Sequence, residues 1–363
     1  MQSLTCLVSM RDDVENPETW YSNGYSQNIK FFYELLELMG HYPIFLFGKD
    51  YLPCRFPLMG REYRGMSINQ VLEEKIHVDI AFEVGVTINE DVRQVLRQRY
   101  GSKIVAVRYG IALVMDMEQL VHNETMTPGI HVAGADAVWT SPHIGYGIQY
   151  LQTILRCPGR IAPYLWEPHF ITRSFKDTDI PERMDIYVME PNLSVIKNAL
   201  IPIAVIEEVW RQAPEAFGKA CVLNGLNFYN RTYFLENIVR YMESVRAETN
   251  KVFFLARYRF DDVFQRPDVL LGHQWGCDLN YLYLEALHIG LPFVHNSEAL
   301  QEVGYYYPGF DVQAGRDRCL EALSGHSIER SAEANRKLLF RYSIHNPEVQ
   351  AEYARLIAEV MEG

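Results

Sequence analysis

The amino-acid sequence predicts an α/β protein made of two Rossmann-like domains that face each other across a cleft. Short apolar runs alternate with amphipathic helical patterns, as in a parallel sheet that helices cover on both faces. A proline-rich stretch, "CPGRIAPYLWEPHF" at 157–170, interrupts this alternation, which then starts again. The chain of 363 residues is also about twice as long as a typical domain.

The first half of the chain follows this pattern from its start. An apolar run at 4–10 predicts the first strand, and a polar loop leads from it into an amphipathic helix at 29–40. Nearly continuous apolar runs are typical of strands that are buried on both faces. The other elements expected in this half are strands at 42–48, 78–86, 103–110 and 135–141, and a helix at 89–101 that ends on a glycine.

The second half repeats the alternation up to an amphipathic helix at 347–362. The sequence therefore predicts domains at 1–170 and 171–345, and a C-terminal helix at 346–363 that is a candidate to pack on the first domain. The elements expected here are strands at 184–190, 219–225, 251–257 and 291–296, and helices at 194–212, at 234–248 and from about 278 to 288.

Composition argues against several classes of protein. A formal net charge of -12 does not suit a protein whose main affinity comes from neutralising nucleic-acid phosphates. The six cysteines form no Cys-x-x-Cys pair or Cys/His cluster, so we expect buried, reduced thiols and no disulfide frame or zinc site. The first residues are charged too early for a signal peptide, and no run approaches the roughly 20 apolar residues of a membrane span. We expect a soluble, cytoplasmic protein.

Ligands of open parallel sheets bind outside the carboxyl ends of the strands. In the first domain, Asn23, Gly24 and Tyr25 precede a helix whose N–H groups can hold an anion or a hydroxyl-rich acceptor; a simple N-terminal cap explains this polar loop equally well. Glu83 ends an apolar strand and is a candidate general base, or else a salt-bridged structural residue, because an unpaired buried carboxylate is costly. His143 follows the last strand of this domain and is the second candidate base.

Polar residues also follow the strands of the second domain. Asn192 comes directly after one strand, and Lys197 is predicted to lie in the first turn of the next helix, an arrangement that suits a diphosphate. Arg257 ends another strand, and its fork of donors suits phosphate recognition, while a solvated arginine is the simpler explanation.

The stretch "GCDLNYLYLEALHIGLPFVHNSE" at 276–298 places a carboxylate inside an apolar helix. Asp278 and Glu285 share one helix face at this spacing. Glu285 therefore needs a partner, and ribose hydroxyls can donate charge-assisted hydrogen bonds to it. The helix start, at Asp278, Leu279 and Asn280, presents backbone N–H groups to a phosphate.

Within this stretch, "LEALHIGLPFVHNSEALQEVG" at 284–304 resembles the donor-site segment of GT-B glycosyltransferases, which has a glutamate, a Gly-x-Pro turn, an apolar strand and a further glutamate. The resemblance implies that Glu285 holds the nucleotide ribose. Retaining members carry another acidic residue eight positions earlier, where this chain has Cys277 beside Asp278. Lys197 lies where those enzymes place phosphate-binding residues. The whole chain also resembles an uncharacterised group of predicted bacterial glycosyltransferases.

The resemblance implies transfer of a hexosyl or pentosyl group from a nucleotide-sugar, with a UDP-sugar as the first candidate, to a hydroxyl of a glycan, lipid or other acceptor. The second domain would bind this donor and the first domain the acceptor. No metal or other cofactor is expected, and the Asp-Thr-Asp at 177–179 is predicted to be a solvated loop. A base, Glu83 or His143, is needed only if the reaction inverts the sugar configuration.

Three other functions fit the sequence. They are a nucleotide-sugar epimerase, an inactive sugar-nucleotide binding protein, and a glycosyltransferase acting on hydroxymethylated bases of phage DNA. The stretch "RQVLRQRYGSK" at 93–103 bears on the last, because it gathers Arg93, Arg97, Arg99 and Lys103. A solvated basic helix face explains these residues more simply, so duplex DNA is the less favoured partner.

Overall fold

The structure, a computed structural model, describes residues 2–14, 16, 20, 24–50, 54–122, 131–246 and 250–363. The chain divides into two compact units. Unit 1 comprises Met1–Glu167 together with Arg341–Gly363, and unit 2 comprises Pro168–Phe340. The sequence analysis places the corresponding boundaries at 170 and 345.

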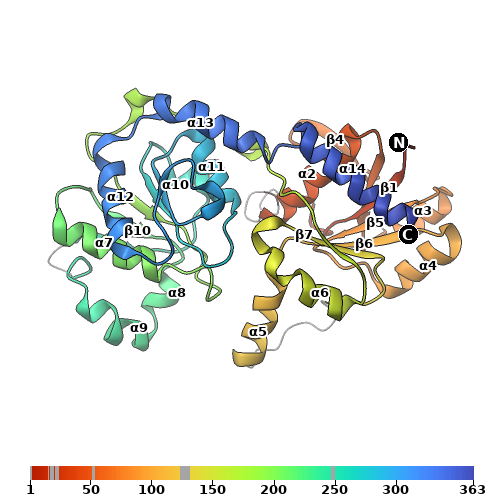
Figure 1. Cartoon of the computed structure of the whole chain (residues 1–363), viewed down its shortest axis with the longest axis horizontal. Helices are drawn as coiled ribbons and strands as arrows, with labels where there is room; N and C mark the ends of the chain where they lie inside the picture. The colour runs from red at the N-terminus through yellow and green to blue at the C-terminus, as the bar shows by residue number, and fades with distance from the viewer. Residues whose placement is uncertain are drawn as a thin grey trace. The chain divides into compact units, whose positions relative to one another are not determined.

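Unit 1 is built around an eight-stranded sheet with the strand order β3-β4-β2-β1-β5-β6-β7-β8 (Figure 1). Neighbouring strands are parallel except for β3 and β4, which form an antiparallel hairpin at one edge. The central strands are apolar and buried, as expected for a sheet covered on both faces. The strands are β1 (Thr5–Ser9), β2 (Tyr42–Phe47), β3 (Arg55–Leu58), β4 (Arg61–Ser67), β5 (Ile80–Val84), β6 (Lys103–Arg108), β7 (Ala137–Thr140) and β8 (Gly159–Ile161).

The helices of unit 1 follow from local signals in the sequence. Helix α4 (Glu90–Tyr100) begins after Asn89, whose side chain accepts a hydrogen bond from the Asp91 N–H at 2.8 Å. It ends at Gly101, which adopts the left-handed conformation with φ 68°. The other helical elements are α2 (Gly24–Leu38), α3 (Ile68–Glu73), α5 (Ala112–His122), the 3-10 helix η1 (Pro142–Gly147) and α6 (Ile148–Leu155).

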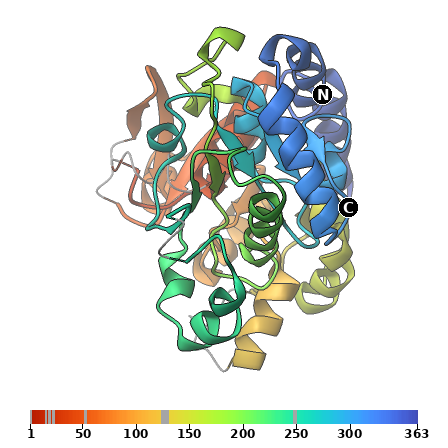
Figure 2. The same cartoon turned by 90° about the vertical axis from the view of Figure 1, so that its left-hand side faces the viewer.

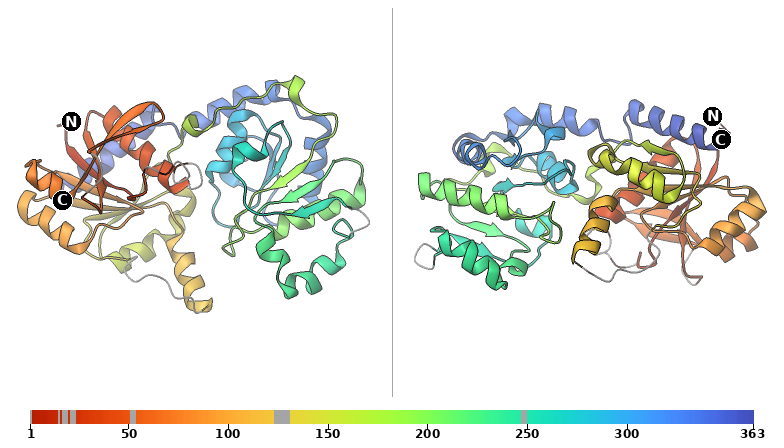
Figure 3. Two further views of the ribbon diagram at one scale, coloured as in Figure 1. Left: turned by 180° about the vertical axis from the view of Figure 1, so that it is seen from behind. Right: turned by 60° about the horizontal axis from the view of Figure 1, so that its bottom comes forward.

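The C-terminal helix α14 (Pro347–Glu362) belongs to unit 1, although unit 2 precedes it in the sequence. Tyr353 donates a hydrogen bond to the carbonyl of Pro163 at 2.7 Å, and its ring packs edge-on against Phe32 of α2. The helix lies along unit 1 in each view, where it is dark blue (Figures 1 and 3). The end of the chain thus completes the core of the unit in which the chain begins.

Unit 2 contains a six-stranded parallel sheet with the order β11-β10-β9-β12-β13-β14. Counted from its first strand, this is the 3-2-1-4-5-6 order of a Rossmann-like fold, and strands β4-β2-β1-β5-β6-β7 of unit 1 repeat it. The strand order reverses between β9 and β12, and we call this place the switch point of unit 2. The strands are β9 (Ile186–Val188), β10 (Ala220–Val222), β11 (Val252–Phe254), β12 (Val269–Leu271), β13 (Phe293–His295) and β14 (Tyr305–Tyr306).

Helices cover the sheet of unit 2. Helices α7 (Leu200–Gln212) and α12 (Val312–Gly325) pack side by side, in green and blue in Figure 2. Helix α11 (Tyr281–Ile289) contacts α13 (Ile328–Phe340) and ends at Gly290, where a side chain would collide with Ile328. In the part of the chain that the structure describes, none of the helices has the length and apolar character needed to cross a bilayer.

Two helices predicted for unit 2 need correction. The helix expected at 194–212 begins only at Leu200, because a tight turn with a bridge between Ser194 and Lys197 precedes it. The region expected to be one helix at 234–248 instead contains the end of α9 (Thr232–Asn237) and the 3-10 turn η4 (Val239–Tyr241).

The carboxylate of Glu207 explains the second correction. It accepts hydrogen bonds from the backbone N–H groups of Glu243 and Ser244 at 2.9 and 3.0 Å. Those N–H groups would bond to carbonyls four residues earlier in a continuous helix. The buried carboxylate on α7 therefore holds this segment in a non-helical conformation.

The Asp-Thr-Asp stretch at 177–179 also differs from the prediction of a solvated loop. It forms a 3-10 turn, η3 (Asp177–Asp179), and Asp177 lies at the start of α13. Its carboxylate accepts hydrogen bonds from the Ser327 hydroxyl at 2.8 Å and from the backbone N–H groups of Ile328 and Glu329. Asp177 therefore caps a helix from a distant part of the sequence, and its negative charge interacts favourably with the positive end of the helix dipole.

We predict that Asp177→Ala lowers the stability of unit 2. The change leaves the first N–H groups of α13 without their side-chain acceptor, and the loss of such a cap destabilises a helix. Thr178→Ala is a matched control, since Thr178 is the exposed neighbour of Asp177. Urea denaturation should give a lower midpoint for Asp177→Ala alone; equal midpoints for both variants would contradict the capping role.

Candidate functional site

The carboxyl ends of β9 and β12 meet at the switch point of unit 2. Glu190 follows β9, and the segment Gly272–Gln274 follows β12. Since ligands of this fold bind outside these strand ends, the residues here are the candidates for a binding site.

Glu190 lies at the centre of this place. It is only 1% exposed, and its carboxylate accepts hydrogen bonds from the Tyr283 hydroxyl at 2.8 Å, from the His273 backbone N–H at 3.1 Å and from the Gln274 side-chain amide at 3.4 Å. Burial raises the pKa of Glu190 to about 7, against the lowering effect of these hydrogen bonds. One carboxyl group thus joins the end of β9 to the loop after β12 and to helix α11.

Lys197 brings a positive charge to the same place. Lys197 lies on the loop between β9 and α7, and Asn192 holds this loop in shape. The side-chain oxygen of Asn192 accepts from the Ala199 N–H at 2.8 Å, and the backbone N–H of Asn192 donates to the Lys197 carbonyl at 3.1 Å. Asn192 itself adopts the left-handed conformation, with φ 55°. Burial raises the pKa of the Cys277 thiol, and the neighbouring Lys197 ammonium opposes that rise. The structure therefore brings together Asn192, Lys197 and Glu190, but on a loop instead of the predicted helix.

The loop after β12 leads into helix α11, which begins at Tyr281 and not near Asp278 as predicted. Asn280 is the N-cap residue, and its side chain accepts from the Leu282 N–H at 3.2 Å. The Leu282 N–H at the start of α11 therefore already has an acceptor within the protein and is not available to a phosphate. Leu279 is buried, and the carbonyl of Asp278 accepts a hydrogen bond from the Ser297 hydroxyl at 2.6 Å.

Glu285 lies on α11 and is half-buried. Within the described ranges of the chain, its carboxylate forms no hydrogen bond or ion pair with another residue. Burial raises the pKa of Glu285 to about 7, and the nearby charge of Asp261 adds to the rise. This carboxylate is available for a ligand that donates hydrogen bonds.

Arg257 is exposed and follows β11, which β10 separates from β9 in the sheet. Its chain neighbour Ala256 accepts a hydrogen bond from the Asn224 N–H at 3.3 Å, and the Asn224 side chain donates to the Glu190 carbonyl at 3.1 Å. The loop that carries Arg257 is therefore joined to Glu190 through Asn224, and the phosphate-binding role of Arg257 stays a prediction.

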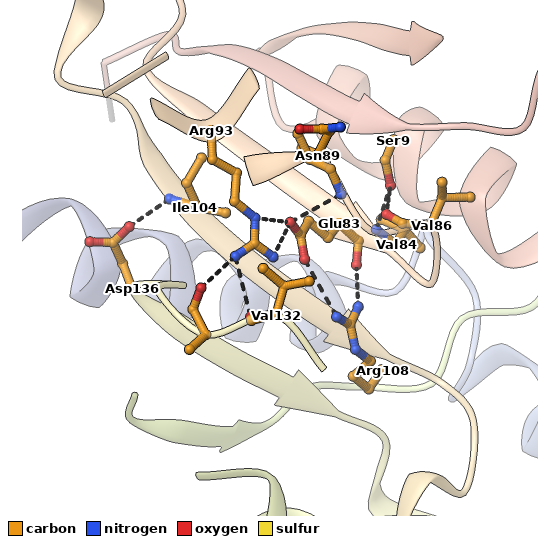
Figure 4. A network of polar contacts seen from close by, with 12 residues as sticks. Ser9, Glu83, Val84, Val86, Asn89, Arg93, Ile104, Arg108, Val132 and Asp136 are labelled. Carbon is orange, nitrogen blue, oxygen red and sulfur yellow. Dashed lines mark hydrogen bonds and ion pairs between the residues drawn. The ribbon is translucent and has the colours of Figure 1, made fainter. Parts of the chain in front are cut away.

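The candidate base Glu83 in unit 1 is enclosed by arginines (Figure 4). Its side chain is fully buried, and one carboxylate oxygen accepts from the guanidinium of Arg93 and from the Ile88 N–H, the latter at 3.2 Å. The other oxygen lies 3.4 Å from the guanidinium of Arg108. Arg93 also donates to the Val132 carbonyl at 3.2 Å. These contacts fill the positions from which a general base would accept a proton, so they favour a structural role for Glu83.

The other candidates of unit 1 lie at two different strand ends. His143 is the second residue of η1, which follows β7, and its ring contacts the Tyr164 ring at a centroid distance of 4.9 Å. Strand β6 lies between β7 and the strand of Glu83, so the two candidate bases do not form a pair. Gly24 and Tyr25 open helix α2, while Asn23 lies outside the described residues.

Tyr25 approaches the place where the strand order of unit 1 reverses, between β1 and β5. Its ring packs over Gly85, where a Cβ atom would lie 1.9 Å from a ring carbon. Gly85 also has a positive φ of 65°, a conformation that glycine adopts without strain. Burial raises the pKa of the Tyr25 hydroxyl, and the charges of Arg108 and Arg11 oppose the rise.

The basic stretch at 93–103 does not form one exposed patch. Arg93 is buried against Glu83, and Arg97 pairs with Asp136 at 2.8 Å. Two of the four cations are therefore paired with carboxylates within unit 1.

His273 and Gln274 were not predicted from the sequence as site residues. The missing signal was β12, whose three apolar residues fall in "PDVLLG" at 267–272 and were not recognised as a strand. A strand there would have placed His273 and Gln274 at a carboxyl end beside Glu190.

The sequence and fold were compared with those of known proteins. Residues 8–357 match the family described as "Protein of unknown function (DUF2827)". No curated protein matches the sequence. Among solved structures, trehalose-6-phosphate synthase OtsA is similar with a TM-score of 0.61 at 10% identity, covering 99% of each chain.

Two further solved structures are similar over the whole chain. An alpha-glucosyltransferase in complex with UDP-glucose and DNA containing an abasic site has a TM-score of 0.57 at 10% identity, covering 99% of this chain and 100% of the other. The alpha,alpha-trehalose 6-phosphate synthase of Burkholderia multivorans has a TM-score of 0.56 at 10% identity, covering 99% of each chain. Identities this low establish the fold alone: the chain has the two-unit GT-B fold, as the sequence predicts.

We predict that Glu83→Gln destabilises unit 1. Removing one partner from a buried ion pair leaves uncompensated charge, which costs about 3–5 kcal/mol. Glu90→Gln, at the exposed start of α4, is the control. Thermal unfolding should show a much lower midpoint for Glu83→Gln than for the control. A Glu83→Gln protein with wild-type stability would reject the structural role and restore Glu83 as a candidate base.

Proposed function

We propose that this chain, which belongs to the DUF2827 family of proteins of unknown function, is a glycosyltransferase that uses a nucleotide-sugar donor. Glu285 carries the proposal. It is a half-buried carboxylate with no hydrogen bond or ion pair in the described part of the chain, on the helix that follows the switch-point loop. Ribose hydroxyls supply the donors that such a group lacks.

In this proposal the diphosphate of the donor binds beside Lys197. The ammonium lies at the carboxyl end of β9, where phosphates bind in sheets of this order. A cation held there stabilises the negative charge that develops on the leaving nucleotide diphosphate. Asn192 positions the loop of Lys197, and Asp278, Leu279 and Asn280 form the backbone around the start of α11.

The similar solved structures support the choice of donor. One of them is in complex with UDP-glucose, and two are trehalose-phosphate synthases. A UDP-sugar is therefore the first donor to test.

The acceptor hydroxyl would be recognised by unit 1 through Tyr25 and the start of α2, and His143 would serve as base if the reaction inverts configuration.

The first test of this function is a thermal-shift screen against UDP, GDP, ADP, CMP and dTDP. A ligand that binds only the folded protein raises its midpoint by mass action. We predict that one nucleotide raises the midpoint of the wild type and of the control Glu333→Ala, which alters an exposed carboxylate of α13 in the same unit. Glu285→Ala should lose the shift. No shift with any nucleotide, or an unchanged shift in Glu285→Ala, would refute the donor site.

The raised pKa of Glu285 predicts a pH-dependent affinity. The ionised carboxylate accepts hydrogen bonds from two hydroxyls, whereas the protonated form has to lose its proton first. Since the pKa is about 7 in the free protein, calorimetric affinity for the nucleotide-sugar should fall as the pH is lowered from 8 to 6, by up to about tenfold per pH unit. Glu285→Gln should flatten this profile.

The stability of the free protein should depend on pH in the opposite direction to its affinity for the nucleotide-sugar. A carboxyl group whose pKa is raised on folding contributes stability below its unfolded pKa of about 4.5, and this contribution is lost as the pH rises through about 7. Glu285→Gln should therefore gain stability relative to the wild type between pH 5 and pH 8. A constant difference across this range would show that Glu285 titrates normally and would remove the basis of the affinity prediction.

A further inference from the structure

Two buried polar atoms at the switch point have no hydrogen-bond partner among the described residues: His273 Nε2 and Gln274 Oε1. The side chains are only 4% and 3% exposed. Buried polar groups of folded proteins are nearly always hydrogen-bonded, so two such atoms on consecutive residues require an explanation. A bound ligand supplies one, since both residues directly follow β12 at the place where ligands of this fold bind.

The unpartnered atom of His273 is one nitrogen of a neutral ring. Burial lowers the pKa of His273 to about 4, so the ring carries one proton. The Tyr307 hydroxyl lies 3.0 Å from His273 Nδ1 and 3.3 Å from the Gly272 carbonyl. When the tyrosine proton is given to the carbonyl, Nδ1 carries the ring proton and Nε2 is an acceptor; when it is given to Nδ1, Nε2 carries the proton and is a donor. A hydroxyl group matches Nε2 in either tautomer, because it both donates and accepts.

The unpartnered atom of Gln274 is the oxygen of its side-chain amide, which is an acceptor. The amide nitrogen donates to the Glu190 carboxylate at 3.4 Å, and Oε1 has no donor among the described residues. Asn296 binds the backbone of Gln274 on both sides, accepting from its N–H at 2.9 Å and donating to its carbonyl at 2.8 Å. The position of this acceptor is therefore determined before any ligand arrives.

The two atoms together select the chemistry of the ligand. Phosphate and carboxylate oxygens are acceptors only and would leave Gln274 Oε1 unsatisfied, whereas a hydroxyl group donates to Oε1 and pairs with His273 Nε2 in either tautomer. The matching ligand is neutral and rich in hydroxyls. Trp275 and Phe310, which are 58% and 52% exposed, lie beside His273: the Phe310 ring centroid is 4.9 Å from that of His273 and 5.8 Å from that of Trp275. Their exposed rings offer an apolar surface to the C–H face of a sugar ring.

The neighbouring charge identifies which part of the substrate binds here. Glu190 contacts both His273 and Gln274, and the Lys197 ammonium is close enough to lower the pKa of Glu190. A diphosphate at Lys197 would thus lie near these two residues. The hydroxyl-bearing group adjacent to a nucleoside diphosphate is the sugar bonded to it.

We propose that His273 and Gln274 form the subsite for the donor's sugar ring, whose hydroxyls form hydrogen bonds with His273 Nε2 and Gln274 Oε1, with Trp275 and Phe310 against the ring. This inference rests on the proposed nucleotide-sugar function. It adds specificity-determining residues and explains why two buried polar atoms have no partner among the described residues of the free protein.

A matched pair of variants tests the subsite. In His273→Asn, the side-chain amide replaces Nδ1 and keeps the hydrogen bond to Tyr307, but no atom replaces Nε2. In His273→Gln, the longer side chain can carry its amide group to the place of Nε2 and restore the hydrogen bond to the hydroxyl. The probes are the nucleoside diphosphate that the thermal-shift screen identifies and the commercially available sugar conjugates of that nucleotide, measured by calorimetry on the full chain.

We expect His273→Asn to bind the nucleoside diphosphate within twofold of the wild type and the tightest-binding nucleotide-sugar at least fivefold more weakly. His273→Gln should recover most of this loss, and Trp275→Ala should weaken the nucleotide-sugar only. Equal loss of both probes in His273→Asn, or no loss of either, would overturn the subsite while leaving the donor site intact. Absence of binding by any nucleotide to the wild type would overturn the proposed function and the subsite with it. Midpoints of thermal unfolding for each variant show whether it is folded.

Discussion

The buried carboxyl group of Glu190 is the constraint on which the site of unit 2 depends. Strands β9 and β12 are adjacent, but no backbone ladder continues beyond their ends, so the loops there need other partners. Glu190 supplies them by accepting hydrogen bonds from His273, Gln274 and Tyr283. A single side chain from the first strand of the sheet thereby determines the conformation of the loop that precedes α11.

Asparagine side chains hold the neighbouring loops in place by hydrogen bonds of the same kind. Asn192 shapes the loop of Lys197, Asn280 caps α11, and Asn296 binds the backbone of Gln274. An asparagine amide carries both a donor and an acceptor, so it can replace a missing backbone partner. These side chains hold the loops in place without a ligand. The groups that have no partner among the described residues, Glu285 included, are those that would form hydrogen bonds with the nucleotide-sugar that we propose as the donor. Such preorganisation lowers the cost of binding.

Periodicity in the sequence predicted the two Rossmann-like units, because their buried strands and amphipathic helices leave clear patterns. Glu285 was predicted from its position in an apolar helix, and the structure shows a half-buried carboxylate without a partner there. Glu83 looked similar by the same reasoning, yet its partner Arg93 is ten residues away on the next helix and Arg108 comes from the next strand. Contacts between distant segments distinguish the two glutamates, and local patterns do not contain them. The loop residues after β12 were missed because a three-residue strand leaves too short a signal.

Hydrogen–deuterium exchange of the full chain, with and without the nucleoside diphosphate that raises its thermal midpoint, tests the central claim most directly. The claim is that the switch point of unit 2, between β9 and β12, is the donor site. Added nucleotide should slow exchange in peptides that cover 189–199 and 272–289, which contain Lys197 and Glu285, while peptides of the Glu83 network in unit 1 exchange as before. Protection confined to unit 1, or to unit 2 peptides outside these two segments, would contradict the account.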